Sequence, residues 1–143
     1  MLRAPFKLEY TYKRSTGPII GKFFDALSKN KILGTKNSNG DILVPAAEFD
    51  PVTCEELKDF VEVSSTGTIK SFTWINKPRD HHLLNKPFAF ALINLDGTSS
   101  CMLHMVTNCQ EEDLYMGQKV TVVWNSKKTK TILDIKYFEL KND

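Results

Sequence analysis

Cysteine and histidine are the side chains of this 143-residue chain that could ligate a metal or act as nucleophile and base. The sequence holds three of each: Cys54, Cys101, Cys109, His81, His82 and His104. A structural zinc site needs thiolates or imidazoles, commonly as Cys-x-x-Cys pairs, and these cysteines lack that spacing. A reactive cysteine needs a nearby base or positive field, and no motif supplies one. We therefore expect no independent enzymatic activity. The unpaired cysteines favour a reduced, cytoplasmic setting.

The histidines give a weaker signal. His81 and His82 are adjacent in a polar loop, and neighbouring residues cannot easily share one tetrahedral ion. His104 lies within the apolar run Met102 to Met105. It is either an outward-facing or hydrogen-bonded strand residue, or a polar contact in a ligand pocket.

The stretch from Ile32 to Leu57 predicts two extended runs that each end in a tight turn. Asn39-Gly40 is a strong hairpin signal, and Asp50-Pro51 begins the second turn. Two such knuckles form the layout of a zinc ribbon. The ligand positions would be Lys36, Asn39, Asp50 and Thr53, none of which is a thiolate. We predict a metal-free ribbon in which Asp50 accepts backbone N–H groups as an Asx-turn.

An amphipathic helix is expected before this ribbon. Thr16 or Gly17 can cap it, and Pro18 suits its first position. One apolar stripe recurs at spacings of three and four, and consists of Ile19, Ile20, Phe23, Phe24 and Leu27. The stripe either packs on the chain's own barrel or docks on a partner subunit, and we carry it forward as a partner-docking surface.

The N-terminal arm, residues 1–14, reads as an extended segment. Leu8, Tyr10 and Tyr12 alternate with polar residues, the period of a half-buried strand. Packing on its own domain is the favoured interpretation, and docking on a partner chain is the alternative.

Five strands follow. They are predicted at 60–75, with a bend at Gly67, and at 88–95, 101–106, 119–124 and 132–140. A bent first strand followed by a hairpin favours a small barrel of the OB type. The expected fold is mainly β, with an N-terminal helix, a degenerate zinc-ribbon-like hairpin and a five-stranded OB-fold barrel. The expected division is arm and helix at 1–31, ribbon at 32–58 and barrel at 59–143.

Composition narrows the classes of function. The net charge is +2 and the hydrophobic fraction 41%, values of an ordinary globular domain. No apolar run is long enough to span a membrane, and we expect no secretory signal. OB barrels can bind single-stranded nucleic acid. Phe72 and Trp74, on the face of Lys70, would suit that role, as would the turn lysines Lys127, Lys128 and Lys130. The same groups would suit the adenine and phosphates of CoA.

Several short sequence blocks together indicate a resemblance to a known family, although each block alone is a weak signal. They are Ile32-Leu33-Gly34-Thr35, Val44-Pro45, Glu48 to Thr53, Phe60 to Val63, Gly67-Thr68-Ile69, Lys86 to Ile93, Leu95-Asp96-Gly97, Leu103-His104, Ile132 to Ile135 and Tyr137-Phe138-Glu139. In this order and spacing, the sequence resembles the acyl-CoA-associated OB-fold family, which pairs a rubredoxin-like zinc ribbon with an OB barrel. It is similar to the subgroup with Asp-Pro-x-Thr in place of the second Cys-x-x-Cys.

The resemblance implies a non-catalytic accessory subunit. Such proteins dock on thiolase-like or lipid-transfer-type enzymes and help to hold or channel acyl-CoA. From residue type and strand face, we expect Phe72, Trp74 and His104 to line that channel. We expect no zinc and no other cofactor, and nucleic-acid binding is the alternative function. The partner and the acyl group stay open.

Overall fold

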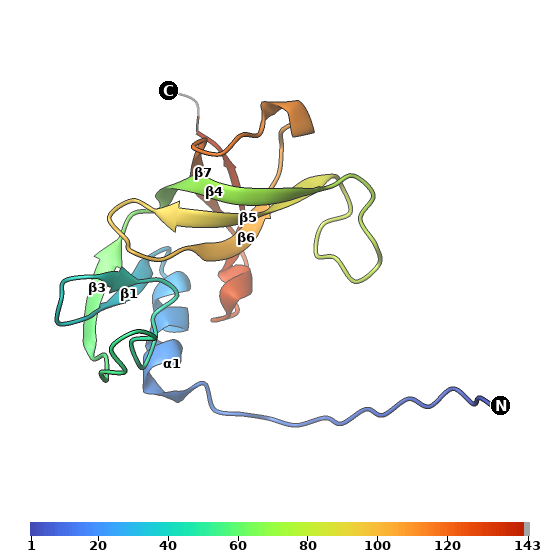
Figure 1. Cartoon of the computed structure of the whole chain (residues 1–143), viewed down its shortest axis with the longest axis horizontal. Helices are drawn as coiled ribbons and strands as arrows, with labels where there is room; N and C mark the ends of the chain where they lie inside the picture. Colours follow the sequence, from blue (N-terminus) through green and yellow to red (C-terminus); the bar gives the residue numbers. More distant parts are fainter. Residues whose placement is uncertain (142–143) are drawn as a thin grey trace.

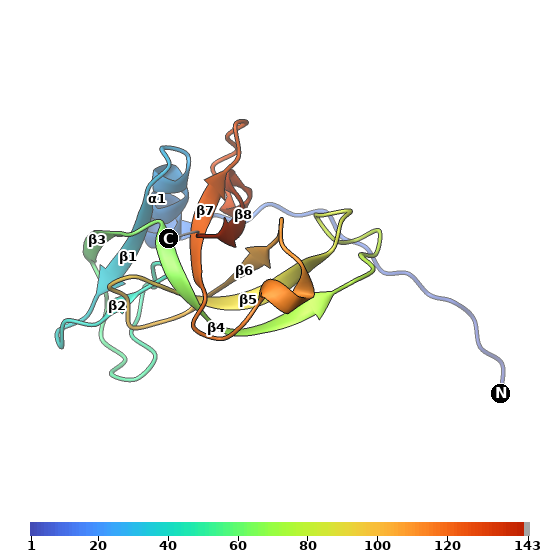
Figure 2. The same cartoon turned by 90° about the horizontal axis from the view of Figure 1, so that it is seen from above.

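The computed structural model describes residues 1–141. One helix, α1 (Gly17–Leu27), precedes a small antiparallel sheet with strand order β2-β1-β3. That sheet is built from β1 (Ile32–Lys36), β2 (Ile42–Leu43) and β3 (Asp59–Val63). A closed barrel follows, in the order β4-β5-β6-β8-β7. Figures 1 and 2 show the helix and the small sheet together on one side of the barrel.

The barrel strands lie close to their predicted positions. They are β4 (Thr66–Ile75), β5 (Phe88–Leu95), β6 (Met102–Val106), β7 (Lys119–Trp124) and β8 (Ile135–Leu140), with the short 3-10 helices η1 (Glu111–Asp113) and η2 (Ile132–Asp134). The predicted fold class is confirmed, because the chain is mainly β with one α-helix and a five-stranded OB barrel. The three-part division of the chain remains a prediction. Neither α1 nor the 3-10 helices of residues 1–141 have the length and apolarity that a membrane crossing requires.

Helix α1 begins where Pro18 predicts it and packs against β1 and η2. Phe23 and Leu27 are fully buried in the main core, which also contains Ile69 and Phe138. The same core extends through the barrel and into the small sheet. Ile19 and Phe24 of the stripe are partly buried and pack against the same core. Four of the five stripe residues therefore contribute to this chain's own fold.

The first predicted strand is in fact two strands. Residues 60–63 lie in β3, which pairs with β1 in the small sheet, so the expected continuous strand from 60 to 75 is wrong. The Ser64 hydroxyl accepts the Thr66 N–H at 3.1 Å and so interrupts the ladder. Period-two alternation predicts that a segment is a strand but does not predict which strand it pairs with. The sequence pattern therefore could not distinguish pairing in the barrel from pairing in the small sheet.

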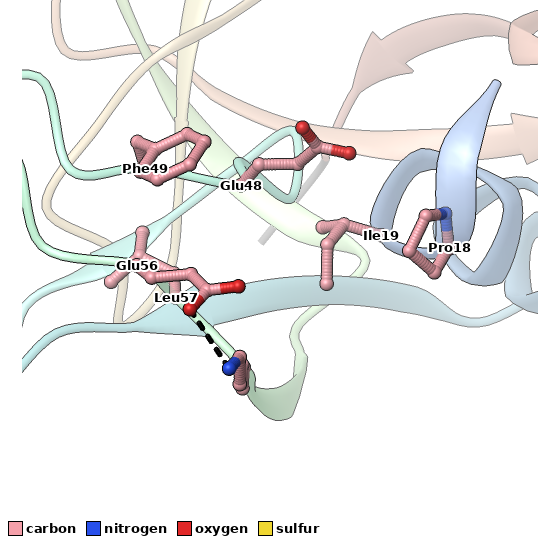
Figure 3. A pocket seen from close by; sticks show the side chains of 7 residues that line it. Pro18, Ile19, Glu48, Phe49, Glu56 and Leu57 are labelled. Carbon is pink, nitrogen blue, oxygen red and sulfur yellow. Dashed lines mark ion pairs between the residues drawn. The ribbon is translucent and has the colours of Figure 1, made fainter.

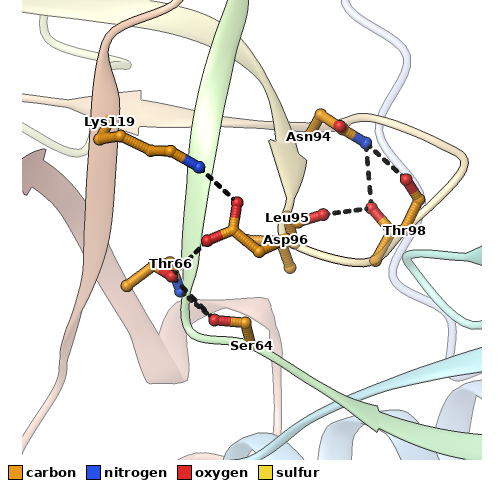
Figure 4. Close-up of polar contacts among 7 residues, drawn as sticks. All are labelled: Ser64, Thr66, Asn94, Leu95, Asp96, Thr98 and Lys119. Carbon is orange, nitrogen blue, oxygen red and sulfur yellow. Dashed lines mark hydrogen bonds and ion pairs between the residues drawn. The ribbon is translucent and has the colours of Figure 1, made fainter.

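A polar cluster fastens the point where β4, β5 and β7 meet (Figure 4). Asp96, in the turn after β5, accepts a hydrogen bond from the Thr66 hydroxyl at 2.7 Å and pairs with Lys119 at 2.7 Å. The hydrogen bond from Lys119, followed by that from Thr66, lowers the pKa of Asp96 below its ordinary value. Asn94 reaches across the same turn and donates to the Thr98 carbonyl. It also donates to the Ser100 carbonyl. These contacts tie the β5–β6 hairpin to the start of β4.

Gly67 is needed because β4 and β5 approach closely at that position. A Cβ there would lie 2.7 Å from the Asn94 carbonyl oxygen and 3.0 Å from the Leu95 Cα. Backbone atoms cannot move aside cheaply, so we expect Gly67→Ala to lower the free energy of unfolding by at least about 1 kcal/mol. Urea unfolding measures this, with the exposed Ser71→Ala as control. Equal midpoints for the two variants would contradict the expectation.

The predicted bend of the first barrel strand lies slightly further along the chain. The β4–β5 register shifts between Ile69 and Ser71, so Lys70 occupies an irregular position. Ile69 is fully buried, whereas Lys70 and Ser71 are both exposed. Because the extra residue changes the alternation, Lys70 does not share the face of Phe72, and that expectation is wrong.

The N-terminal arm extends away from the body as a segment without regular secondary structure (Figure 1). Phe6, Tyr10 and Tyr12 are 84%, 76% and 74% exposed. The favoured interpretation, in which the arm packs on its own domain, is therefore wrong. The alternative interpretation, a partner chain, stays a prediction.

Candidate functional site

The two knuckles of the ribbon are joined by a side-chain hydrogen bond. Asn37 follows β1, and its Nδ2 donates to Asp50 Oδ2 in the second knuckle at 2.9 Å. Both residues are buried. The Asn37 amide also donates to Asp41 at 3.2 Å, and its carbonyl accepts the Asp41 N–H at 2.8 Å. We call this arrangement of Asn37 and Asp50 the knuckle clasp.

Asp50 also organises its own turn. Its Oδ1 accepts the backbone N–H groups of Val52 and Thr53, each at 2.8 Å. The predicted Asx-turn is therefore confirmed. These bonds, that of Thr53 first and then the clasp with Asn37, lower the pKa of Asp50 below its ordinary value of 3.8. The carboxylate is thus held in its charged form by the groups around it.

The donor set of the ribbon does not fit zinc. The clasp offers one amide and one carboxylate, which hydrogen-bond to one another. Lys36, Asn39 and Thr53, at the expected ligand positions, are exposed. Across residues 1–141, no three or more His, Cys, Asp or Glu side chains are grouped so that they could hold a metal. Asn37 was missed from sequence, although an Asn beside a hairpin turn is a common partner for backbone and side-chain groups.

Removing the clasp should loosen the ribbon without involving a metal. We expect Asp50→Ala to lower the melting temperature by about 5 °C or more at neutral pH, because three donors lose their acceptor. The folded-state pKa is below 3.8, so this contribution is present above pH 3.8 and is lost as the pH falls through the folded pKa. Thermal melting at neutral and acidic pH checks this, with the exposed Asp59→Ala as control. A chelator that lowers the wild-type melting temperature would contradict the metal-free clasp.

The three residues expected to line a channel lie on one face of the barrel sheet, and their role as channel residues stays a prediction. Phe72 on β4 is opposite Ala91 on β5, which is opposite His104 on β6. Phe72 and His104 are thus two strand spacings, about 10 Å, apart on one face. Trp74 lies on the same face, opposite Ala89. Phe72 and Trp74 pack against the main core and remain partly exposed.

His104 is buried with an unsatisfied nitrogen. It is 8% exposed, and its ring meets Phe138 edge-on at 5.5 Å. Within residues 1–141, its Nδ1 is the one buried side-chain nitrogen or oxygen without a hydrogen-bond partner. Burial lowers the pKa of His104 from 6.5 to about 4, so the imidazole is neutral at pH 7. The side chain therefore does not face solvent, and its Nδ1 atom makes no hydrogen bond within the described residues.

An apolar cavity of about 180 Å³ adjoins this histidine. Its walls are Leu83, Phe90, Leu103, His104, Met105 and Ile132. Pockets for drug-sized ligands usually measure 300 Å³ or more. This cavity therefore suits an aliphatic group better than a nucleotide, and the neutral imidazole is its one titratable wall residue.

Two of the lysines expected to contact phosphates instead contact other side chains of this chain. Lys128 lies over the Trp124 ring at 5.1 Å, and Lys130 pairs with Asp25 of α1 at 2.9 Å. Lys70 is turned away from the aromatic face by the register shift. These residues do not form the continuous basic groove with stacking aromatics that single-stranded nucleic acid requires.

A second hollow lies between the start of α1 and the ribbon (Figure 3). It measures about 430 Å³ and is lined by Pro18, Ile19, Glu48, Phe49, Glu56, Leu57 and Lys58. We call it the helix–ribbon groove. Of the predicted docking stripe, Ile19 lines this groove, Ile20 and Phe24 are half-buried, and Phe23 and Leu27 are core residues. The groove itself was not predicted, because its walls are distant in sequence.

His81 and His82 line one polar hollow with Trp74, Lys77 and Arg79, and the cysteines do not join them there. Cys54 and Cys101 are exposed, and burial followed by the charge of Asp113 raises the pKa of Cys109. A raised pKa disfavours the thiolate that nucleophilic chemistry needs. His82 packs edge-on against Phe88 with ring centroids 5.4 Å apart.

The fold and these sites define an OB-fold protein with an appended ribbon whose side chains do not fit a zinc site. Residues 60–125 match the family model for the C-terminal OB-fold domain of ChsH2. The resemblance to the acyl-CoA-associated OB-fold family is thereby confirmed, and the matched residues include the barrel strands β4 to β7. A search of curated proteins gave no significant match.

Two solved structures share the fold. One is a protein of unknown function from the DUF35 family of Sulfolobus solfataricus, with 23% sequence identity and a TM-score of 0.62, covering 85% of this chain and 83% of that chain. The other is the Ltp2-ChsH2(DUF35) aldolase, with 14% identity and a TM-score of 0.66, covering 90% of this chain and 98% of that chain. At these identities the likeness concerns the fold alone.

Proposed function

We propose that this protein is a non-catalytic accessory subunit in acyl-CoA metabolism, docked on a thiolase-like or lipid-transfer-type enzyme in the cytoplasm. The observation that carries the proposal is the match of residues 60–125 to the ChsH2 OB-fold domain. A protein of the same fold is described as part of an aldolase with Ltp2. Fold alone does not fix function, so the chemistry of the surfaces must agree with the role.

The docking surface on the enzyme would be the remainder of the helix stripe together with the ribbon. Ile20 and Phe24 are half-buried apolar side chains that a partner could cover.

The barrel would contribute a wall for the acyl group. The cavity beside His104 is small and apolar, which fits an alkyl group better than the charged nucleotide of CoA. Phe72 and Trp74 lie on the same barrel face as His104, whereas Phe90, Leu103 and Met105 of the cavity alternate with that face. The two aromatic side chains would therefore contribute to a part of the channel separate from this cavity. In this role the chain needs neither zinc nor another cofactor, and acyl-CoA is a ligand of the assembled complex.

Co-expression with thiolase-like enzymes of the same cell, followed by affinity purification and mass spectrometry, tests the assignment. We expect a stable complex in which the enzyme turns over acyl-CoA and this chain alone does not. Turnover by the purified chain alone would overturn the non-catalytic role. Salt-sensitive binding of single-stranded DNA or RNA would instead favour the nucleic-acid alternative. In the complex, His104→Leu should change kinetics for acyl chain length while assembly is unchanged.

A further inference from the structure

We propose that the N-terminal arm, residues 1–16, of one copy of this protein occupies the helix–ribbon groove of a second copy. The result is an arm-exchanged homodimer. This pairing is independent of the enzyme partner proposed above.

The arm presents apolar surface without covering it. Leu2, Phe6, Leu8, Tyr10 and Tyr12 are each more than 60% exposed. The polar contacts of the arm are short-range, between Lys7 and Glu9 at 2.6 Å and between Ser15 and Gly17 at 3.2 Å. Contiguous apolar surface of this kind commonly marks an interaction site. The alternation of Leu8, Tyr10 and Tyr12 with polar residues gives the segment one apolar face when extended.

The arm and the ribbon carry net charges of opposite sign. Residues 1–16 carry four basic side chains, Arg3, Lys7, Lys13 and Arg14, and one acidic side chain, Glu9. The ribbon, residues 32–58, carries five carboxylates, Asp41, Glu48, Asp50, Glu55 and Glu56, and two lysines, Lys36 and Lys58. The arm and the ribbon are therefore electrostatically complementary, which favours encounter and fixes register in an interface.

The groove combines that charge with an apolar floor (Figure 3). Ile19, Phe49 and Leu57 supply carbon surface, and the carboxylates of Glu48 and Glu56 stand at its sides. Glu56 is already paired with Lys58 at 2.8 Å. A volume of about 430 Å³ is ample for one aromatic side chain. A segment with tyrosines next to Lys13 and Arg14 offers both the aromatic and the cationic groups.

The position of the groove explains why a second copy can reach it. Pro18 and Ile19 line the groove, and the arm joins the helix at Gly17, so the arm leaves the body at the rim of the groove. A twofold axis near that point would lay each arm across the other copy's groove. Residues 10–16 span roughly 20 Å when extended, which is enough for such a crossing. The contact would occur twice, as in other isologous dimers. It would cover Ile19 and leave Ile20 and Phe24 for the enzyme.

Charge reversal on each side of the contact provides the test. One variant reverses the arm, Lys13→Glu with Arg14→Glu, and the other reverses the groove, Glu48→Lys with Glu56→Lys. By sedimentation equilibrium, we expect a wild-type dimer and, for each variant alone, a dissociation constant raised about tenfold or more. Mixing the two variants in equal amounts should restore the dimer, because both arm–groove contacts then join opposite charges.

Glu111→Lys with Glu112→Lys is the matched control for the groove variant, since it makes the same two glutamate-to-lysine changes on exposed residues of η1. This control should dimerise like the wild type, and circular dichroism confirms that every variant is folded. A monomeric wild type would overturn the proposal, whether the arm is then protected from trypsin by folding onto its own groove or is cleaved freely. A dimer that persists in both variants, or a mixture that stays monomeric, would overturn it as well.

Discussion

Phe23→Ala is expected to lower the free energy of unfolding by about 3–5 kcal/mol, the cost of emptying a buried phenylalanine site. Phe23 is 1% exposed and belongs to the core that unites α1 with the barrel. Because the helix is only 11 residues long, it has little stability apart from this packing. Chemical unfolding followed by circular dichroism measures the change.

Ile20→Ala is the matched control on the same helix. Ile20 is half-buried, so its truncation should cost about 1 kcal/mol or less. The same change should weaken assembly with the enzyme, which a pull-down measures. If Phe23→Ala were as stable as Ile20→Ala, the helix would not be part of the core, and the whole stripe would be free for a partner.

Acidification is expected to destabilise the protein through His104, by about 3 kcal/mol between neutral pH and pH 4. The pKa of this histidine is 6.5 when unperturbed and about 4 in the fold. As the pH falls below 6.5, the unfolded chain binds the proton before the folded chain does. Stability is therefore fully present above pH 6.5 and declines toward pH 4. Denaturant unfolding across this range measures the slope.

His104→Leu should remove most of that decline, since leucine does not titrate and needs no hydrogen-bond partner for a buried nitrogen. At neutral pH the variant should be at least as stable as the wild type. His81→Gln, at an exposed loop position, controls for loss of a histidine. If His104→Leu kept the full decline between pH 6.5 and pH 4, His104 would not be the buried group that resists protonation.

Local patterns in the sequence predicted helix α1, the ribbon turns and most of the barrel strands. Pro18 and the three-and-four spacing of apolar residues predicted α1, which spans Gly17–Leu27. Asn39-Gly40 predicted the first knuckle, where Gly40 has φ +90°. Alternation predicted the barrel strands, because side chains on a strand face opposite sides by geometry alone. Asp50 could be identified as a turn acceptor because its backbone partners lie only two and three residues away.

Contacts between distant segments needed the tertiary structure. Sequence patterns do not encode which edge a strand joins, so the pairing of β3 with β1 was not predicted. The Asn37–Asp50 hydrogen bond spans 13 residues, and neither residue alone indicates the other. A one-residue register shift moved Lys70 off the face of Phe72. The sequence by itself determined the helix, most of the strands, the turns and the absence of thiolate pairs in the ribbon. Only the tertiary structure decided that His104 is buried beside an apolar cavity and that α1 is part of the core, because burial depends on packing among elements far apart in the chain.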